Sequence, residues 1–79
     1  MAIDIKTAFG MAVKVKRVEQ RLSQEQLANG ADMARSFISR VERGTANPSV
    51  SSVMKIADTL ECLPSELWLR AEQYLSKKP

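Results

Sequence analysis

The chain has 79 residues, 44% of them hydrophobic, which is enough for one modest core and excludes an intrinsically disordered chain. No apolar run approaches the ~18 residues of a membrane span, no signal-peptide layout is present, and one cysteine without histidine excludes an internal disulfide and the usual zinc sites. The formal charge of +3 permits nucleic-acid binding without demanding it. We therefore expect a cytoplasmic protein with no metal ion, no cofactor and no membrane partner.

The positive charge is concentrated in the first half of the chain. Residues 1–45 hold eight lysines and arginines against five acidic residues, a net charge of +3, whereas residues 46–79 hold four of each sign. Any nucleic-acid surface is therefore expected in the first half.

The spacing of apolar residues predicts helices and no strands, because beyond the first few residues nothing alternates with a period of two. The first helix is expected over residues 5–20, with Phe9, Ala12 and Val13 on its inward side. A second apolar stripe, interpreted as ordinary surface residues, consists of Met11, Val15 and Val18.

Two short helices joined by a tight turn are expected next. Ser23 and Gln26 have the spacing of a capping box, in which each side chain bonds to the backbone N–H of the other residue. This box opens a second helix over residues 24–29. After a break, a third helix is expected over residues 35–43, with a left-handed C-cap at Gly44.

The second half of the chain predicts two more helices. Residues 47–49 (NPS) form a turn that ends in an N-cap, so a fourth helix spans residues 50–60, with an inward stripe that begins at Val50. A proline favoured in a first helical turn opens the last helix, over about residues 64–76. We therefore predict an all-α fold of five helices in a single domain, residues 1–79.

The predicted third helix has one apolar and one polar face. Its apolar stripe, which we expect to be buried, consists of Phe37, Ile38 and Val41. The opposite face carries only arginine and serine side chains: Arg35, Ser36, Ser39, Arg40 and Arg43. The planar fork of arginine matches guanine or phosphate, and serine bonds to base edges or phosphates. From the face alone, a merely solvated surface is the preferred interpretation, because such faces are common on helices.

Three segments resemble the Cro/C1-type (XRE) helix-turn-helix family: residues 22–28 (LSQEQLA), 35–44 (RSFISRVERG) and 47–49 (NPS). The resemblance covers about residues 9–68, most of the chain. Within the family the chain is most similar to controller proteins of restriction–modification systems. These share its small size, a Phe-Gly pair near the start (Phe9-Gly10) and a final helix used for dimerisation. Phage-type repressors and Cro proteins are the next most similar.

The resemblance implies a compact, lambda-repressor-like DNA-binding domain with its helix-turn-helix at residues 23–44. The protein would then be a sequence-specific transcriptional regulator that binds double-stranded DNA in the major groove. The positions that match base-reading residues are Arg35, Ser36, Ser39 and Arg40. Those that match phosphate-binding residues are Ser23, Gln24, Arg43, Thr45 and Asn47, of which Gln24 can also brace the recognition helix. Arg17 and Glu42 match a buried ion pair between the first and third helices, with plain surface charges as the alternative.

The sequence departs from the family pattern at three positions near the motif. Arg21 and Asp32 stand where the family usually has glycine, and an arginine in a left-handed conformation carries a steric cost. Ala34 stands where a serine or threonine often caps the recognition helix. Asp32 or a bound phosphate would then have to serve as the cap.

A homodimer on a palindromic operator is expected, because one domain of this size makes few base contacts. The last helix is the expected interface, through Trp68, Leu69, Ala71, Tyr74 and Leu75. Leu67 is assigned to the monomer core, and Trp68 fits either location. RNA polymerase is a further candidate partner, contacted or occluded at the promoter.

Two other classes of function stay open. The first is an antitoxin-like regulator whose final helix mainly binds another protein. The second is an enzyme, which we do not expect, because the chain lacks histidine, a glycine-rich phosphate loop and a base partner for Cys62.

Overall fold

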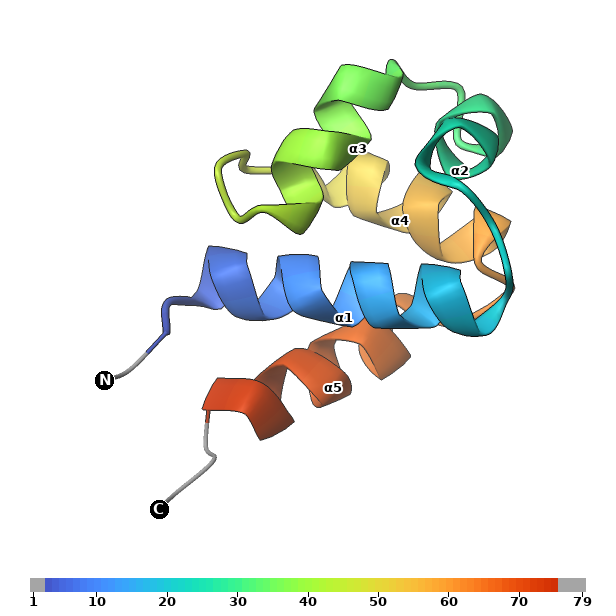
Figure 1. The fold of residues 1–79 in the computed structure, drawn as a ribbon. Helices are drawn as coiled ribbons and strands as arrows, with labels where there is room; N and C mark the ends of the chain where they lie inside the picture. Colours follow the sequence, from blue (N-terminus) through green and yellow to red (C-terminus); the bar gives the residue numbers. More distant parts are fainter. Residues whose placement is uncertain (1–2, 76–79) are drawn as a thin grey trace.

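The computed structural model describes residues 3–75, and Figure 1 shows their fold. This part of the chain contains no strand and consists of five helices: α1 (Ile5–Glu19), α2 (Gln24–Gly30), α3 (Arg35–Glu42), α4 (Val50–Thr59) and α5 (Pro64–Leu75). The predicted all-α fold is confirmed, and every helix end within the described residues lies within one residue of its prediction. Residue 76, which the prediction included in the last helix, lies outside the described residues.

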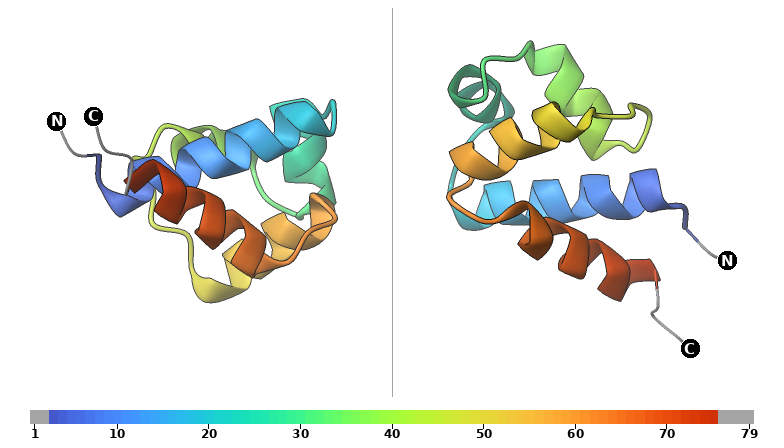
Figure 2. Two further views of the ribbon diagram at one scale, coloured as in Figure 1. Left: turned by 90° about the horizontal axis from the view of Figure 1, so that it is seen from below. Right: turned by 180° about the vertical axis from the view of Figure 1, so that it is seen from behind.

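Helix α1 runs through the middle of the molecule. It contacts α5 on one side and α3 on another, while α2 packs against α3 and α4. Figures 1 and 2 show α5 on the opposite side of α1 from the group formed by α2, α3 and α4. Helix α3 therefore packs against α1 and α2 with its inner face, and its opposite face lies at the surface.

The hydrophobic core draws on every helix. Its largest completely shielded side chains include Leu27, Ile38, Ile56 and Leu67, from α2, α3, α4 and α5 in turn. Burying a side chain of this size contributes about 1.5–3 kcal/mol relative to leaving it exposed. Leu67 therefore belongs to the core, as expected. None of the described helices is both long and apolar enough to span a bilayer.

The structure corrects three predictions about apolar residues. Ala71, expected at a dimer interface, has 0% exposure, because it lies one turn from Leu67 on the side of α5 that packs against α1. Phe37, expected to be buried, is half-buried, because it lies at the edge of the apolar stripe of α3. Val50, expected to face inward, is 89% exposed, because the first turn of α4 lies at the margin of the core.

Gly10 allows the backbones of α1 and α3 to touch. A Cβ atom at this position would lie 2.3 Å from the carbonyl oxygen of Val41 and 2.8 Å from that of Glu42. Real Cβ atoms do not approach backbone oxygens this closely, so any side chain would push the two helices apart. The Phe-Gly pair of the sequence thus has a structural reason: Phe9 fills the core while its neighbour allows close packing.

Four helices end in the same Schellman turn, in which the residue after the C-cap is left-handed. The residues at this position are Arg21 (φ 60°), Asp32 (φ 56°), Gly44 (φ 78°) and Glu61 (φ 57°). In the first turn the N–H of Leu22 donates to the carbonyl of Arg17 at 3.1 Å, and the equivalent distances in the other turns are 2.8, 2.9 and 3.0 Å. Arg21 and Asp32 therefore keep the turn that glycine would make, although the left-handed conformation costs an L-residue about 1–2 kcal/mol.

Candidate nucleic-acid interface

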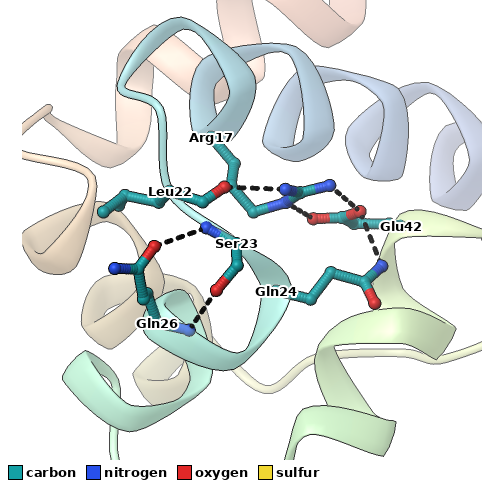
Figure 3. Close-up of polar contacts among 6 residues, drawn as sticks. All are labelled: Arg17, Leu22, Ser23, Gln24, Gln26 and Glu42. Carbon is teal, nitrogen blue, oxygen red and sulfur yellow. Dashed lines mark hydrogen bonds and ion pairs between the residues drawn. The ribbon is translucent and has the colours of Figure 1, made fainter.

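The capping box fixes the start of α2. The N–H of Gln26 donates to Ser23 Oγ at 3.0 Å, and the N–H of Ser23 donates to Gln26 Oε1 at 2.8 Å (Figure 3). Both bonds of the predicted box are present, so this prediction is confirmed. They satisfy two backbone donors that the first turn of a helix leaves without a partner.

An ion pair joins α1 to α3 next to the start of α2. Arg17 Nε lies 2.6 Å from Glu42 Oε2, and Arg17 Nη2 lies 3.0 Å from Glu42 Oε1 (Figure 3). The third nitrogen, Nη1, donates to the carbonyl of Leu22 at 2.8 Å. The side chains of Arg17 and Glu42 are only 12% and 3% exposed, so this is a buried, bidentate pair rather than a pair of surface charges.

Gln24 joins the same network from α2. Its Nε2 atom donates to Glu42 Oε1 at 3.0 Å (Figure 3). The carboxylate of Glu42 thus accepts three hydrogen bonds, from residues 18 and 25 positions away in the chain. Because α1 and α2 both hold this one side chain, the orientation of α3 is fixed with respect to both helices.

The outward face of α3 carries donors that folding leaves free. Arg35, Ser36, Arg40 and Arg43 are exposed, and Ser39 is half-buried. The ion pairs within residues 3–75 are Arg17 with Glu42 and Arg70 with Glu19, so the three arginines on this face have no carboxylate partner there. The structure therefore brings together, on one exposed face, the residues that the sequence assigned to base reading, along with Arg43.

The N-terminus of α3 is uncapped. Ala34 occupies the N-cap position and no side chain bonds to the first turn, so Asp32 does not act as the substitute cap. The N–H of Phe37 donates back to the carbonyl of Ala34 at 3.0 Å. The preceding backbone N–H groups of Arg35 and Ser36 have no acceptor in the part of the chain that the structure describes.

The other expected phosphate contacts lie at the ends of α2 and α3. Ser23 and Arg43 are exposed at the start of α2 and the end of α3. Thr45 and Asn47 are exposed in the loop after α3, and Thr45 Oγ1 donates to the carbonyl of Arg40 at 3.2 Å. Each can reach a ligand from solvent.

The free thiol of Cys62 lies outside this surface, between α4 and α5, and is half-buried. Burial raises the pKa of this thiol, and the nearby carboxylate of Glu66 raises it further. The sulfur is therefore protonated at neutral pH and is a poor nucleophile.

Comparison with known proteins identifies the family. A protein-family model described as helix-turn-helix matches residues 13–67, which is more than half of the chain. The chain belongs to the Cro/C1-type helix-turn-helix family of DNA-binding transcription regulators. Control protein C.BamHI of Bacillus amyloliquefaciens is 38% identical over 68 residues, which cover 85% of this chain and 84% of the relative.

Solved structures of this helix-turn-helix family share the fold. The restriction-modification controller protein C.AhdI from Aeromonas hydrophila is 38% identical and has a TM-score of 0.76, over 77% of this chain and 92% of that one. The controller protein C.Esp1396I, solved as a tetramer in complex with its natural 35-base-pair operator, is 24% identical and has a TM-score of 0.85. The structural match covers 95% of this chain and 99% of C.Esp1396I, which shows that the two chains share a fold.

The last helix of this helix-turn-helix protein exposes part of the predicted interface. Leu69 is 59% exposed and Leu75 is 39% exposed, while Tyr74 is half-buried against the core. Trp68 is 38% exposed and also packs on Phe9, with ring centroids 4.5 Å apart and planes tilted by 32°. Trp68 therefore closes the monomer core with one face and reaches the surface with another.

An apolar groove beside Trp68 was not predicted from the sequence. It has a volume of about 890 Å³ and lies between α4 and α5, lined mainly by Pro48, Val50, Val53, Met54, Pro64 and Trp68. Met54 is 48% exposed in this groove. The signal in the sequence was Met54, an apolar residue about 100° around the helix from Val53 and outside the inward stripe predicted for this helix.

Proposed function

We propose that this helix-turn-helix protein binds a specific palindromic DNA operator as a homodimer and regulates transcription from it. The observation that carries the proposal is the contrast between the two faces of α3. Its inner face is held by Arg17 and Gln24 through Glu42, and its outer face presents donors without partners. A helix of this kind enters the major groove as a rigid unit with its donors directed at the bases.

In this proposal one set of residues reads the bases and another set binds the phosphates. Base reading belongs to Arg35, Ser36, Ser39 and Arg40: the arginines suit the O6 and N7 atoms of guanine, and the short serines let the helix enter a groove about 12 Å wide. Phosphate binding belongs to Ser23, Gln24, Arg43, Thr45 and Asn47. Phosphate contacts raise affinity for any sequence, and base contacts create the preference for one sequence.

The second subunit would dock on the exposed apolar surface of α4 and α5. Trp68 from the predicted interface lines the groove there together with Val50 and Met54, and Leu69 and Leu75 are exposed farther along α5. A dimer would cover this surface and place two copies of α3 on half-sites about one helical turn apart. The similarity to control protein C.BamHI over most of both chains favours a restriction–modification gene as the target. Regulation would act by contacting RNA polymerase or by occluding it.

Selection from random-sequence DNA tests the proposal. The purified protein should enrich an inverted repeat whose half-site centres are about 10 base pairs apart. Sedimentation at tens of micromolar should give a dimer, and a monomer at that concentration would contradict the assembly. Recovery of no consensus sequence would contradict sequence-specific binding.

Arg35→Ala separates base reading from general attraction to DNA. It should weaken binding to the selected operator by about 1–3 kcal/mol and leave binding to random DNA much less affected. Arg70→Ala is the control, because it removes an arginine of the same charge that lies on α5, away from α3, and pairs with Glu19. Equal losses of Arg35→Ala on operator and random DNA would refute the base-reading role.

A further inference from the structure

One contact on α3 lies outside the network around Glu42. The guanidinium carbon of Arg40 lies over the ring of Phe37, 5.7 Å from the ring centroid. The two residues are three positions apart, so their side chains are neighbours on the helix surface. A cation this close to an aromatic face is attracted by the ring's quadrupole.

The two partners differ in mobility. Phe37 is half-buried and packs against the hydrophobic core, so the monomer itself sets the position of its ring. Arg40 is exposed and its long side chain would otherwise sample many rotamers. Arg35 and Arg43, the other arginines of this surface, have no aromatic partner within residues 3–75.

An aromatic ring beside the guanidinium of Arg40 affects DNA binding differently from a carboxylate in the same place. A carboxylate would neutralise the guanidinium and would repel DNA phosphates. A ring restrains the same group while leaving its positive charge and its N–H donors available. Glu42, the only acidic residue of α3, is turned inward and already held by Arg17 and Gln24, so it does not compete for Arg40.

We propose that Phe37 is a positioning residue that holds the guanidinium of Arg40 ready to read one base of the operator. This role rests on the proposed function, since it names how one base-reading residue of that site is prepared. Ordering a flexible side chain on binding lowers affinity, and a side chain ordered in advance avoids that loss. Phe37 thus acts through Arg40 and sets how sharply one base is discriminated.

A double-mutant cycle on the selected operator tests this role. Phe37→Leu keeps an apolar side chain against the core but removes the ring face, and it should weaken binding roughly two- to fivefold. In an Arg40→Ala background the same substitution should have no further effect. Phe37→Tyr, the matched control, keeps the ring and should bind as the wild type. If Phe37→Leu unfolds, Phe37→Met replaces it in the cycle. An equal loss in both backgrounds would overturn the proposal, because Phe37 would then act on DNA independently of Arg40.

Nuclear magnetic resonance of the free protein gives a readout that needs no DNA. The Hδ and Hε protons of Arg40 should be shifted upfield by the ring in the wild type and in Phe37→Tyr, and should return to ordinary values in Phe37→Leu. Ordinary shifts in the wild type would overturn the proposal even if operator binding is normal. Upfield shifts together with failure to select any operator would instead overturn the proposed function and, with it, any reading role for Arg40.

Discussion

Arg17→Ala would remove the side chain that ties α1 to the recognition helix. The substitution deletes three hydrogen bonds: those of 2.6 and 3.0 Å to Glu42 and that of 2.8 Å to the carbonyl of Leu22. Glu42, whose side chain is 3% exposed, would keep one donor, the amide of Gln24. A buried carboxylate would then lack a compensating charge.

The expected loss is about 3–5 kcal/mol of unfolding free energy, because removing one partner strands the other in a poorly solvated site. A chain of 79 residues has in total about 4–12 kcal/mol, at 0.05–0.15 kcal/mol per residue. The variant should therefore lose a large part of its stability. Replacing both partners by methionine should cost less than about 2 kcal/mol, because no charge is then left buried.

Urea unfolding followed by circular dichroism at neutral pH measures these differences. Arg70→Ala serves as the comparison, since its 3.2 Å pair with Glu19 is 32% and 51% exposed and should contribute no more than about 1 kcal/mol. If Arg17→Ala lost under about 1 kcal/mol, or lost no more than the double methionine variant, the pair would behave as surface charges and the reasoning would be refuted.

Three substitutions test the backbone geometry around the site. Arg21→Gly should raise the free energy of unfolding by about 0.5–1 kcal/mol, and with it the urea midpoint, because glycine adopts the left-handed conformation without steric cost. Arg43→Gly is the control and should lower the midpoint, because Arg43 has an ordinary φ of −85°. Ala34→Ser should add about 1 kcal/mol by capping α3, and an unchanged midpoint would contradict an uncapped helix. Gly10→Ala should lower the free energy of unfolding by at least about 1–3 kcal/mol, because the added Cβ would meet the carbonyl of Val41. A urea midpoint equal to that of the wild type would show that α1 and α3 do not touch in solution.

The sequence predicted the helices well because their ends are marked by local chemistry. Ser23 and Ser49 accept bonds from the first turns of α2 and α4, and Gly44 ends α3 in a left-handed turn. These signals involve residues at most a few positions apart, so they can be recognised without knowing the fold. The left-handed residue Glu61 escaped notice because nothing in its side chain indicates that conformation.

The direction in which apolar residues face was harder to predict. Periodicity places Ala71 and Val50 on apolar stripes, but it cannot say whether the monomer core or a second subunit covers each one. The structure puts Ala71 in the core and Val50 at the surface, because that outcome depends on where α5 and the first turn of α4 lie against the other helices. Similarly, the contact between Phe37 and Arg40 depends on a ring that is only half-buried, which a pattern of apolar residues does not reveal.

The two faces of α3 also separate what folding requires from what recognition requires. Arg17 and Glu42 satisfy each other and Gln24 adds one more bond, so a change to either member of the ion pair leaves a buried charge without its partner. Arg35 and Arg43 have no carboxylate partner in the described structure, so the fold does not depend on them. If the proposed function holds, base preference can change through the outward residues while the framework stays constant. Arg40 is the intermediate case, because its contact with Phe37 links an outward donor to a side chain anchored in the core.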